Sequence, residues 1–442
     1  MLFFGVAWIS PPSAITLENP WRFFLQKRFT VETFLTSGNK NAPCTGGARL
    51  KLAWLFLLAI ILLPGRSLAW TDGELVIWMD SARAQAMERI AHKCETDLGI
   101  KVSIETPQNI TTDFPLAAAA GKGPDIVIWA HDKVGEWANG GLIAPVNVAP
   151  EYAKNFFAKA WQATRHEGLS WGYPIAMESV TLIYNKRLLK RPPPSQLSEL
   201  VSINTQLKEK NPGVNAILWD YHSAYYSWGI LASAGGYVFG KTSNDYDVRN
   251  VGVATPGAIA GLKEIIALIR AGTLPRYVAY STVESLMGQG KVAMIISGPW
   301  AWSNLLASGI DFGLAPIPGV DGKPGHPFVG VSVAYVNRSS PNTNLAPYFI
   351  EHYLLTDEGL TAMNRAKPIG VPALISFYQS LSQSNARLRE LDASLELGEV
   401  MPNVPEMGRF FSSMATALQV ATEGHASAQK ALSDAAATIR GQ

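Results

Sequence analysis

The stretch Gly123–Asp132, GPDIVIWAHD, decides how the rest of this sequence is interpreted. It opens with a Gly-Pro turn signal, and Ile126–Trp129 is an apolar run of the kind that forms a strand buried on both faces of a sheet. The run ends in a polar cluster, at the point where open α/β sheets bind ligands. An indole face covers the C–H patch of a sugar ring, and a carboxylate accepts hydrogen bonds from its hydroxyls. Trp129 and Asp132 therefore suit a carbohydrate, and an ordinary strand end is the competing interpretation.

Composition sets the broad class of the protein. The chain has 442 residues, enough for two or three domains, and it is 48% hydrophobic and 16% charged, as globular proteins are. The formal net charge is +2 and no basic stripe is present, so nucleic acid is not an expected partner. The 13 tryptophans fit either carbohydrate recognition or a large apolar core.

Cysteine and histidine usage gives no sign of a metal or another cofactor. Cys44 and Cys94 lack metal-ligand spacing, and His131 has no His, Cys or Asp at ligand spacing. We therefore expect His131 to orient a neighbour or to pack, rather than to bind a metal. Cys94 is expected inside a helix. It would be the sole cysteine left if the N-terminal segment is removed.

Residues 49–69 have the pattern of a signal peptide. Basic residues precede the apolar run Leu52–Pro64, which is too short to span a bilayer comfortably, and Ser67-Leu68-Ala69 fits a cleavage site. The mature chain would begin at Trp70, and a retained membrane anchor is the alternative. Residues 1–48 are either a long atypical leader or an upstream region wrongly included in the reading frame, and we favour the second interpretation.

The first part of the mature chain reads as strand and helix in alternation. Strands are predicted at Glu74–Met79 and Lys101–Glu105, and helices at Ala84–Leu98, stopped by Gly99, and at Phe114–Ala120. With the strand in GPDIVIW this makes a βαβαβ start. It predicts a parallel sheet with helices on both faces.

The later part predicts two passages between lobes. Glu178 lies in a short link between strand-like segments, the second of which is Thr181–Tyr184, and Val329–Val336 is expected to return to the first lobe. Thr255-Pro256 predicts a capped helix start. Further helices are expected at Gln196–Lys210, Ser281–Gly290, Ala346–Leu355, Glu358–Asn364 and Gly424–Arg440, and a strand at Val292–Ile296.

From Gly73 to Arg440 the chain resembles the periplasmic maltose- and maltodextrin-binding proteins of bacterial ABC sugar importers, within extracellular solute-binding family 1. The collinear segments that carry the resemblance are ELVIW (Glu74–Trp78), GPDIVIWAHD, YPIAMES (Tyr173–Ser179), LIYNK (Leu182–Lys186), GPWAWSN (Gly298–Asn304), PFVGV (Pro327–Val331), YLLTDEGL (Tyr353–Leu360) and MPNVPEM (Met401–Met407).

The resemblance implies an α/β fold of the two-lobed type II periplasmic-binding class, each lobe a mixed, mainly parallel sheet flanked by helices. The first lobe would comprise 70–177 and 334–382, and the second 180–330 and 385–442, with a hinge between them. An oligosaccharide would bind in the cleft between the lobes, and the closed form would dock onto an inner-membrane ABC permease. We expect an exported, periplasmic, monomeric protein without enzyme activity or cofactor, and a chemoreceptor is a possible second partner.

Matching positions give candidate ligand contacts. They are the aromatic residues Trp129, Tyr225, Tyr280 and Trp300, the carboxylates Asp132 and Glu178, and Met401. Lys133 stands where the family has Arg, which keeps the charge but loses the planar fork.

Several positions depart from the family pattern. The family's Asn-Gly-Asp-Lys is here Asp80-Ser81-Ala82-Arg83, so a carboxylate is missing at Ala82, and Ser223 replaces another. Each unpaired hydroxyl would cost about 1–3 kcal/mol. Phe411 stands for a Trp and Ala415 for an Arg, and the neighbouring Phe410 competes with Phe411 for the ligand. Asp80 is a candidate replacement carboxylate, and Arg83 is either a contact or a solvated charge.

Three functions remain open from the sequence. The first is the binding of an α-glucoside or related oligosaccharide for import, and the second is a binding protein for a different disaccharide or polyol. The third is an exported glycoside hydrolase, with Asp132 and Glu178 as its acid–base pair. Against the third, no catalytic carboxylate motif, G-x-S-x-G elbow or Walker-type loop occurs.

Overall fold

The computed structural model of this protein describes residues 73–242 and 245–442. The chain divides into two units, Met1–Ser67 and Leu68–Gln442, and only the second contains described residues. The predicted leader and signal peptide lie outside them. Within the described ranges, no helix is both long and apolar enough to cross a membrane.

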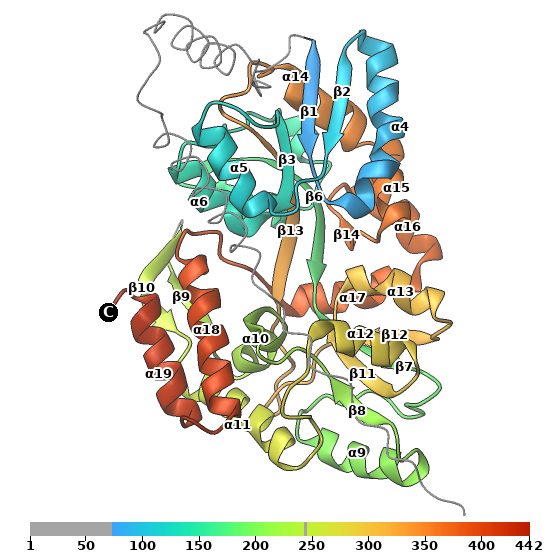
Figure 1. Ribbon diagram of the computed structural model, residues 1–442, viewed down its shortest axis with the longest axis vertical. Helices are drawn as coiled ribbons and strands as arrows, with labels where there is room; N and C mark the ends of the chain where they lie inside the picture. The colour runs from blue at the N-terminus through green and yellow to red at the C-terminus, as the bar shows by residue number, and fades with distance from the viewer. Residues whose placement is uncertain (1–72, 243–244) are drawn as a thin grey trace, which may run out of the picture. The chain divides into compact units, whose positions relative to one another are not determined.

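The strands of the described part form two larger sheets and two small hairpins (Figure 1). The strands are β1 (Glu74–Trp78), β2 (Lys101–Glu105), β3 (Ile126–Ala130), β4 (Arg165–His166), β5 (Leu169–Ser170), β6 (Tyr173–Ser179), β7 (Thr181–Asn185), β8 (Asn215–Leu218), β9 (Tyr237–Lys241), β10 (Tyr246–Gly252), β11 (Val292–Ser297), β12 (Phe312–Ala315), β13 (Phe328–Val336), β14 (Val371–Pro372) and β15 (Glu399–Val400).

The first sheet confirms the predicted βαβαβ start. Its order is β14-β6-β13-β3-β1-β2, with β15 added beside β13, and β1 pairs in parallel with both β2 and β3. Right-handed crossovers that reverse direction along a sheet place their helices on opposite faces. Accordingly, α4 (Ser81–Leu98) and α5 (Ile110–Ala119) lie on different sides of this sheet (Figure 1).

The second sheet has the order β12-β7-β11-β8. Only its β11–β8 pairing is parallel, whereas β7 runs antiparallel to both β11 and β12. In the first sheet β13 is likewise antiparallel to β3 and β6. Both sheets are mixed, as predicted, but parallel pairing does not predominate. The reason is that β7 and β13, with which the chain passes from one sheet to the other, run opposite to the strands beside them.

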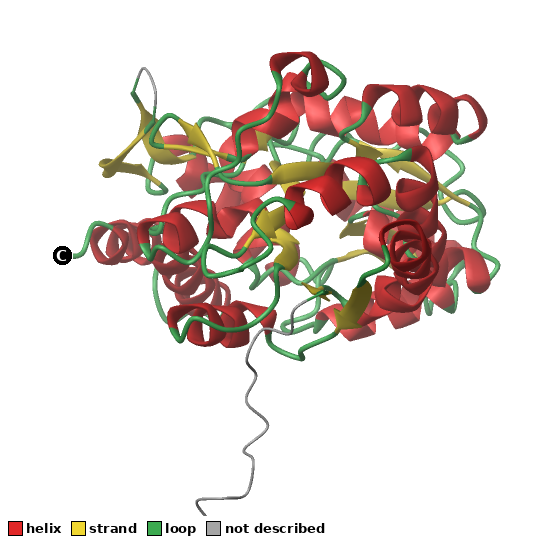
Figure 2. Cartoon of the chain, turned by 90° about the horizontal axis from the view of Figure 1, so that it is seen from above, coloured by secondary structure: helices red, strands yellow, loops and turns green. Residues whose placement is uncertain are grey.

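Helices lie around the strands, as Figure 2 shows, and each of the two larger sheets is the centre of one lobe of an α/β fold. Besides α4 and α5 they are α6 (Val134–Asn139), α7 (Pro150–Ala153), α8 (Ala158–Ala163), α9 (Glu199–Lys210), α10 (Ala224–Ser233), α11 (Pro256–Arg270), α12 (Tyr280–Gly288), α13 (Trp302–Ala307), α14 (Leu345–Phe349), α15 (Asp357–Ala366), α16 (Ile375–Ser384), α17 (Ala386–Leu397), α18 (Met407–Thr422) and α19 (Ala428–Ile439). Two short 3₁₀ helices, η1 (His131–Lys133) and η2 (Pro299–Ala301), and one π-helix, η3 (Ile350–Leu354), complete the set.

Local signals in the sequence account for several boundaries. Gly99 ends α4 in the left-handed conformation at φ 68°, and Cys94 is fully buried inside that helix. Thr255 caps α11 by accepting a hydrogen bond from Ala258 N at 3.2 Å. All three outcomes match the predictions. The β9–β10 hairpin and the helices α16, α17 and α18 were not predicted.

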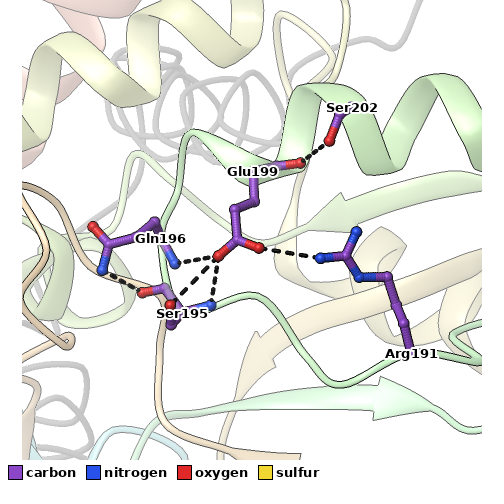
Figure 3. A network of polar contacts seen from close by, with 5 residues as sticks. All are labelled: Arg191, Ser195, Gln196, Glu199 and Ser202. Carbon is purple, nitrogen blue, oxygen red and sulfur yellow. Dashed lines mark hydrogen bonds and ion pairs between the residues drawn. The ribbon is translucent and has the colours of Figure 1, made fainter.

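A polar network holds the start of α9 (Figure 3). The Glu199 carboxylate accepts hydrogen bonds from the backbone N–H groups of Ser195 and Gln196 at 2.9 and 3.0 Å. It also accepts one from Arg191 at 3.2 Å. Acidic groups favour the first turn of a helix because free N–H groups point there. One side chain thus fixes both the helix start and the proline-rich loop before it.

A buried carboxylate fastens the first sheet at the beginning of the GPDIVIWAHD stretch. Asp125 is 0% exposed and accepts hydrogen bonds from Val76 N at 2.6 Å, Ser340 Oγ at 2.5 Å and Asn342 Nδ2 at 3.0 Å. Asn337, just beyond β13, donates its backbone N–H to Asp125 O and its side-chain amide to Pro124 O. The loop after β13 is therefore tied to both β1 and the start of β3.

The substitution Asp125→Ala should lower the free energy of unfolding by about 3 kcal/mol or more, since three donors lose their buried acceptor. Urea unfolding at pH 7 measures this change. The control is Asp434→Ala, which removes an exposed ion pair with Lys430 on α19 and should cost less than about 0.5 kcal/mol. Equal losses in the two variants would contradict this account of Asp125.

Candidate ligand-binding site

Polar side chains from the first sheet gather where its strands end. Asp80 follows β1, and Asp132 lies in η1 directly after β3. Because β1 and β3 are parallel neighbours, their carboxyl ends share one edge of the sheet. Glu178 occupies the penultimate position of β6 and is paired across the ladder with Gly330 of β13.

Glu178 meets an aromatic residue from the other lobe at Gly330. A Cβ atom placed on Gly330 would lie 3.3 Å from the Tyr225 hydroxyl oxygen and 3.4 Å from Glu178 Cγ. The carboxylate side chain and the phenol therefore share the space above this glycine. Tyr225 belongs to α10 and Glu178 to β6, so two of the predicted ligand contacts come together from separate elements of the fold.

Burial controls the ionisation of the two carboxylates. It raises the pKa of Asp132 to about 6, although the neighbouring Lys133 favours the charged form. Burial also raises the pKa of Glu178, and the charges of Arg83 and Lys367 oppose that shift. The pKa of the Tyr225 hydroxyl is raised by burial and further by the negative charges of Glu178 and Asp132. The two carboxylates and the phenol hydroxyl are thus all held where burial disfavours their charged forms.

Four aromatic rings cluster beside these polar groups. Tyr226 stacks on Tyr280 with ring centroids 5.3 Å apart and 16° between planes, and meets Trp300 edge-on at 6.3 Å. The ring centroid of Tyr225 lies 5.8 Å from that of Tyr226 and 6.1 Å from that of Trp300. The structure thereby brings together three of the four predicted platform residues, through Tyr226.

Neighbouring groups fix two rings of this cluster. The Tyr280 hydroxyl hydrogen-bonds to Glu284 and approaches Ser297 Oγ at 3.1 Å. Trp300 lies in η2 with its ring against the backbone of Gly298, where an added Cβ would come within 2.2 Å of the indole. Glycine at this position is required for the indole to adopt its place.

The other predicted contacts take separate positions. Lys133 forms an ion pair with Glu136 at 2.8 Å. Phe411 is partly exposed, whereas Phe410 is fully buried, so Phe411 is the ring of that pair with a free surface. Trp129 is partly exposed on β3, opposite Val333 of β13 in the ladder.

Met401 is 4% exposed and lines a cavity of about 390 Å³ together with Gln162, Arg165 and Lys241. Its backbone carbonyl oxygen lies 2.8 Å from His131 Nε2. Its place as a ligand contact remains a prediction.

His131 is a structural residue, as expected. Its ring is fully buried, Nδ1 accepts the backbone N–H of Val331 at 3.0 Å, and Nε2 lies 2.8 Å from Met401 O. This pair of partners requires the neutral ring with its proton on Nε2. Burial lowers the pKa of His131 to about 4, which keeps the ring in that form. Within the described ranges, no group of three or more His, Cys, Asp or Glu residues is placed to hold a metal ion.

Asp80 and Arg83 form an ion pair at 2.9 Å at the start of α4. Arg83 also donates to the backbone oxygens of Lys367 and Pro368 at 3.3 and 3.1 Å. Arg83 is therefore an anchored group rather than a freely solvated charge, and it acts electrostatically on Glu178.

Two residues of the site were missed by the sequence reasoning. Tyr226 lies in the aromatic-rich stretch YHSAYY (Tyr221–Tyr226), but helical spacing alone does not tell which ring lies between the others. Lys367 affects Glu178 from the loop before β14, 189 positions later in the chain, and no local pattern connects them.

Comparison with known proteins assigns this architecture to a family. The family model for bacterial extracellular solute-binding proteins matches residues 80–359, more than half of the chain. The chain belongs to this family. The matched range begins at Asp80 and contains all of the predicted ligand contacts except Met401 and Phe411.

Individual members of the family are similar to most of the chain. A galactooligosaccharide-binding protein of Bacillus subtilis is 27% identical over 378 residues, which are 84% of this chain and 89% of that protein. A maltotriose-binding protein of Pyrococcus abyssi is 27% identical over 78% of this chain and 77% of its own length. A maltodextrin-binding protein of Bacillus subtilis is 28% identical over 84% and 91%, respectively.

The raised pKa of Asp132 predicts a cost in stability. The folded protein holds this proton more tightly than the unfolded chain, so stability falls as the pH rises from about 4 to about 6. We expect Asp132→Asn to increase the free energy of unfolding at pH 7 by about 1–2 kcal/mol, after allowance for its partial exposure. Urea unfolding at pH 7 and pH 4 tests this, and a gain that is the same at both pH values would contradict it.

Proposed function

We propose that this protein is the sugar-binding subunit of a bacterial ABC importer, which captures an oligosaccharide and delivers it to a permease. The observation that carries the proposal is the meeting of Tyr225 with Glu178 above Gly330, beside a cluster of aromatic rings. The relatives' names, which refer to galactooligosaccharides, maltotriose and maltodextrin, support the same class of ligand.

The chemistry of the site suits a neutral sugar. Pyranose rings present C–H faces that stack on indole and phenol rings, and Trp300 and Tyr225 offer such faces. Sugar hydroxyls donate to carboxylates, and Asp132 and Glu178 are partly buried acceptors. Hydrogen bonds to charged acceptors in such surroundings contribute more than neutral ones do, about 1.5–3 kcal/mol each.

Maltose or a maltodextrin is the ligand we put forward. The matches at Trp129, Tyr225, Tyr280 and Trp300 favour it, and the loss of carboxylates at Ala82 and Ser223 weighs against tight binding of maltose itself. A galactooligosaccharide is the second candidate, since a protein that binds such sugars is among the relatives. A different disaccharide or a polyol is the remaining one.

The proposal assigns no chemical step to the protein. The lobes 70–177 with 334–382 and 180–330 with 385–442 would close around the sugar, which shifts an open–closed equilibrium. The permease would recognise the closed form. Asp132 and Glu178 then act as hydrogen-bond acceptors rather than as the acid–base pair of a hydrolase, in keeping with relatives that are binding proteins.

Export completes the proposed role. A signal peptide at 49–69, cleaved before Trp70, would release the protein to the periplasm as a monomer. N-terminal sequencing of the protein recovered from the periplasm tests this, because a mature start at or near residue 70 is expected. A chemoreceptor as a second partner remains part of the same hypothesis.

Calorimetric titration with maltose, maltotriose, a galactooligosaccharide, other disaccharides and a polyol tests the ligand class. Saturable binding of maltotriose in the micromolar range is the expected result. Binding of another sugar alone would keep the transport role and replace the ligand. Absence of binding to every sugar would overturn the proposal.

The variant Trp300→Ala should weaken binding of the same sugar at least tenfold, about 1.4 kcal/mol, because one stacking face is removed. Tyr348→Ala is the matched control, since Tyr348 is an aromatic residue on α14 that is 44% exposed. It should leave the affinity unchanged. If the two variants bind equally well, Trp300 does not stack on the ligand.

A further inference from the structure

The start of α4 contains a carboxylate that is well placed to act through another residue. Asp80 occupies the N-cap position of α4, yet its side chain makes no capping hydrogen bond. Its Oδ2 atom accepts from Arg83 Nη1 at 2.9 Å. Among the described residues, its Oδ1 atom has no hydrogen-bond partner, and it has essentially no accessible surface. A ligand hydroxyl cannot reach Oδ1 without a rearrangement. Oδ2 already accepts one hydrogen bond from Arg83, and the Asp80 side chain is 37% exposed, so the role of Asp80 is decided by its partner as much as by its surface.

Arg83 links Asp80 to a loop that is far away in the sequence. Its Nε and Nη2 atoms donate to the carbonyl oxygens of Lys367 and Pro368, at 3.3 and 3.1 Å. Three of its five N–H donors are therefore used, on three different nitrogen atoms, and this fixes the plane of the guanidinium group. Without Asp80, the remaining two bonds to neutral carbonyls would hold a charged side chain that is only 16% exposed.

The anchored loop packs directly against Glu178. Gly370 has φ +85°, and an added Cβ would lie 2.4 Å from Met177 O and 3.3 Å from Glu178 Cβ. The next residue, Val371, pairs with Met177 in the ladder between β14 and β6. Segment 367–371 is thus fastened to Arg83 at one end and to the strand of Glu178 at the other.

We propose that Asp80 is a positioning residue, which holds Arg83 against the 367–368 carbonyls and thereby fixes Glu178 for the sugar. This inference rests on the proposed sugar-binding function and gives Asp80 a role other than that of a replacement ligand. It also explains how Arg83 stays close enough to Glu178 to favour its charged form. All members of this chain of contacts belong to the first sheet or to elements joined to it, so it does not depend on closure of the lobes.

A double-mutant cycle on the full chain distinguishes positioning from direct contact. The variants are Asp80→Ala, Arg83→Ala and the double substitution, titrated calorimetrically with maltotriose. We expect each single variant to lose about tenfold in affinity, and the double variant to lose no more than Arg83→Ala alone. A double variant whose loss is the product of the single losses, or an Asp80→Ala variant that binds like the parent, would overturn the proposal.

The matched control is Asp97→Ala at the other end of α4. Asp97 is also paired with a cation of its own helix, Lys93, at 2.6 Å. This variant should bind maltotriose like the parent chain. Circular dichroism and thermal unfolding of every variant establish that the fold is retained. Asp80→Asn, which keeps an oxygen acceptor for Arg83, should recover part of the affinity lost in Asp80→Ala.

A second measurement needs no sugar. Carboxyl ¹³C NMR of the full chain follows the titration of Glu178, with Glu178→Gln to assign its signal. If Asp80 acts through Arg83, Asp80→Ala should raise the pKa of Glu178, because the stabilising guanidinium is no longer held in place. Removal of a nearby negative charge with Arg83 unmoved would lower that pKa or leave it unchanged, which would overturn the proposal. Failure of the parent chain to bind any sugar would refute the proposed function, and the titration would still report on Asp80.

Discussion

The buried carboxylate of Asp125 is the constraint on which the rest of the site depends. It accepts hydrogen bonds from β1 and from the loop beyond β13, and its own backbone oxygen accepts from Asn337. These bonds secure the end of β13 against β1 and β3. Since a strand register shifted by one residue turns every side chain to the other face, this fastening bears on where Gly330 and Glu178 lie along β13 and β6. Burial raises the pKa of Asp125, and the hydrogen bonds oppose that shift.

The aromatic cluster comes from the second lobe, and the two carboxylates come from the first. Tyr225, Tyr280 and Trp300 come from helices or turns around the second sheet, whereas Asp132 and Glu178 belong to the first. The two carboxylates are held where burial disfavours their charge. That arrangement opposes stability and is expected of a site built to receive donors from outside the protein. His131 shows the opposite case, because both of its buried ring nitrogens have partners within the fold.

Much of the first sheet could be predicted from sequence because its signals are local. The strand at 101–105 and the helix end at Gly99 follow from alternation and from the left-handed conformation that glycine adopts easily. The β9–β10 hairpin was missed, since its pairing contains register shifts and its strands mix polar and apolar residues without clear alternation. The prevalence of antiparallel pairing in the second sheet was also missed, because pairing direction depends on where the chain crosses between sheets.

The sequence by itself determined the α/β class, the order of strand and helix at the start of the described chain, and the residue types for a carbohydrate site. Hydrophobic periodicity, helix caps and turn signals each involve only a few neighbouring residues, so they can be recognised in the sequence itself. Only the tertiary structure decided that Tyr226 lies among the other rings and that Phe411 rather than Phe410 keeps a free surface. It also decided that Asp80 is bonded to Arg83 and that the charge of Lys367 acts on Glu178. Some of these contacts join residues on different helices, strands and loops. Others depend on which of two neighbouring side chains is packed into the core. They are set by how the elements pack and by which polar groups are buried together, and no local pattern encodes that.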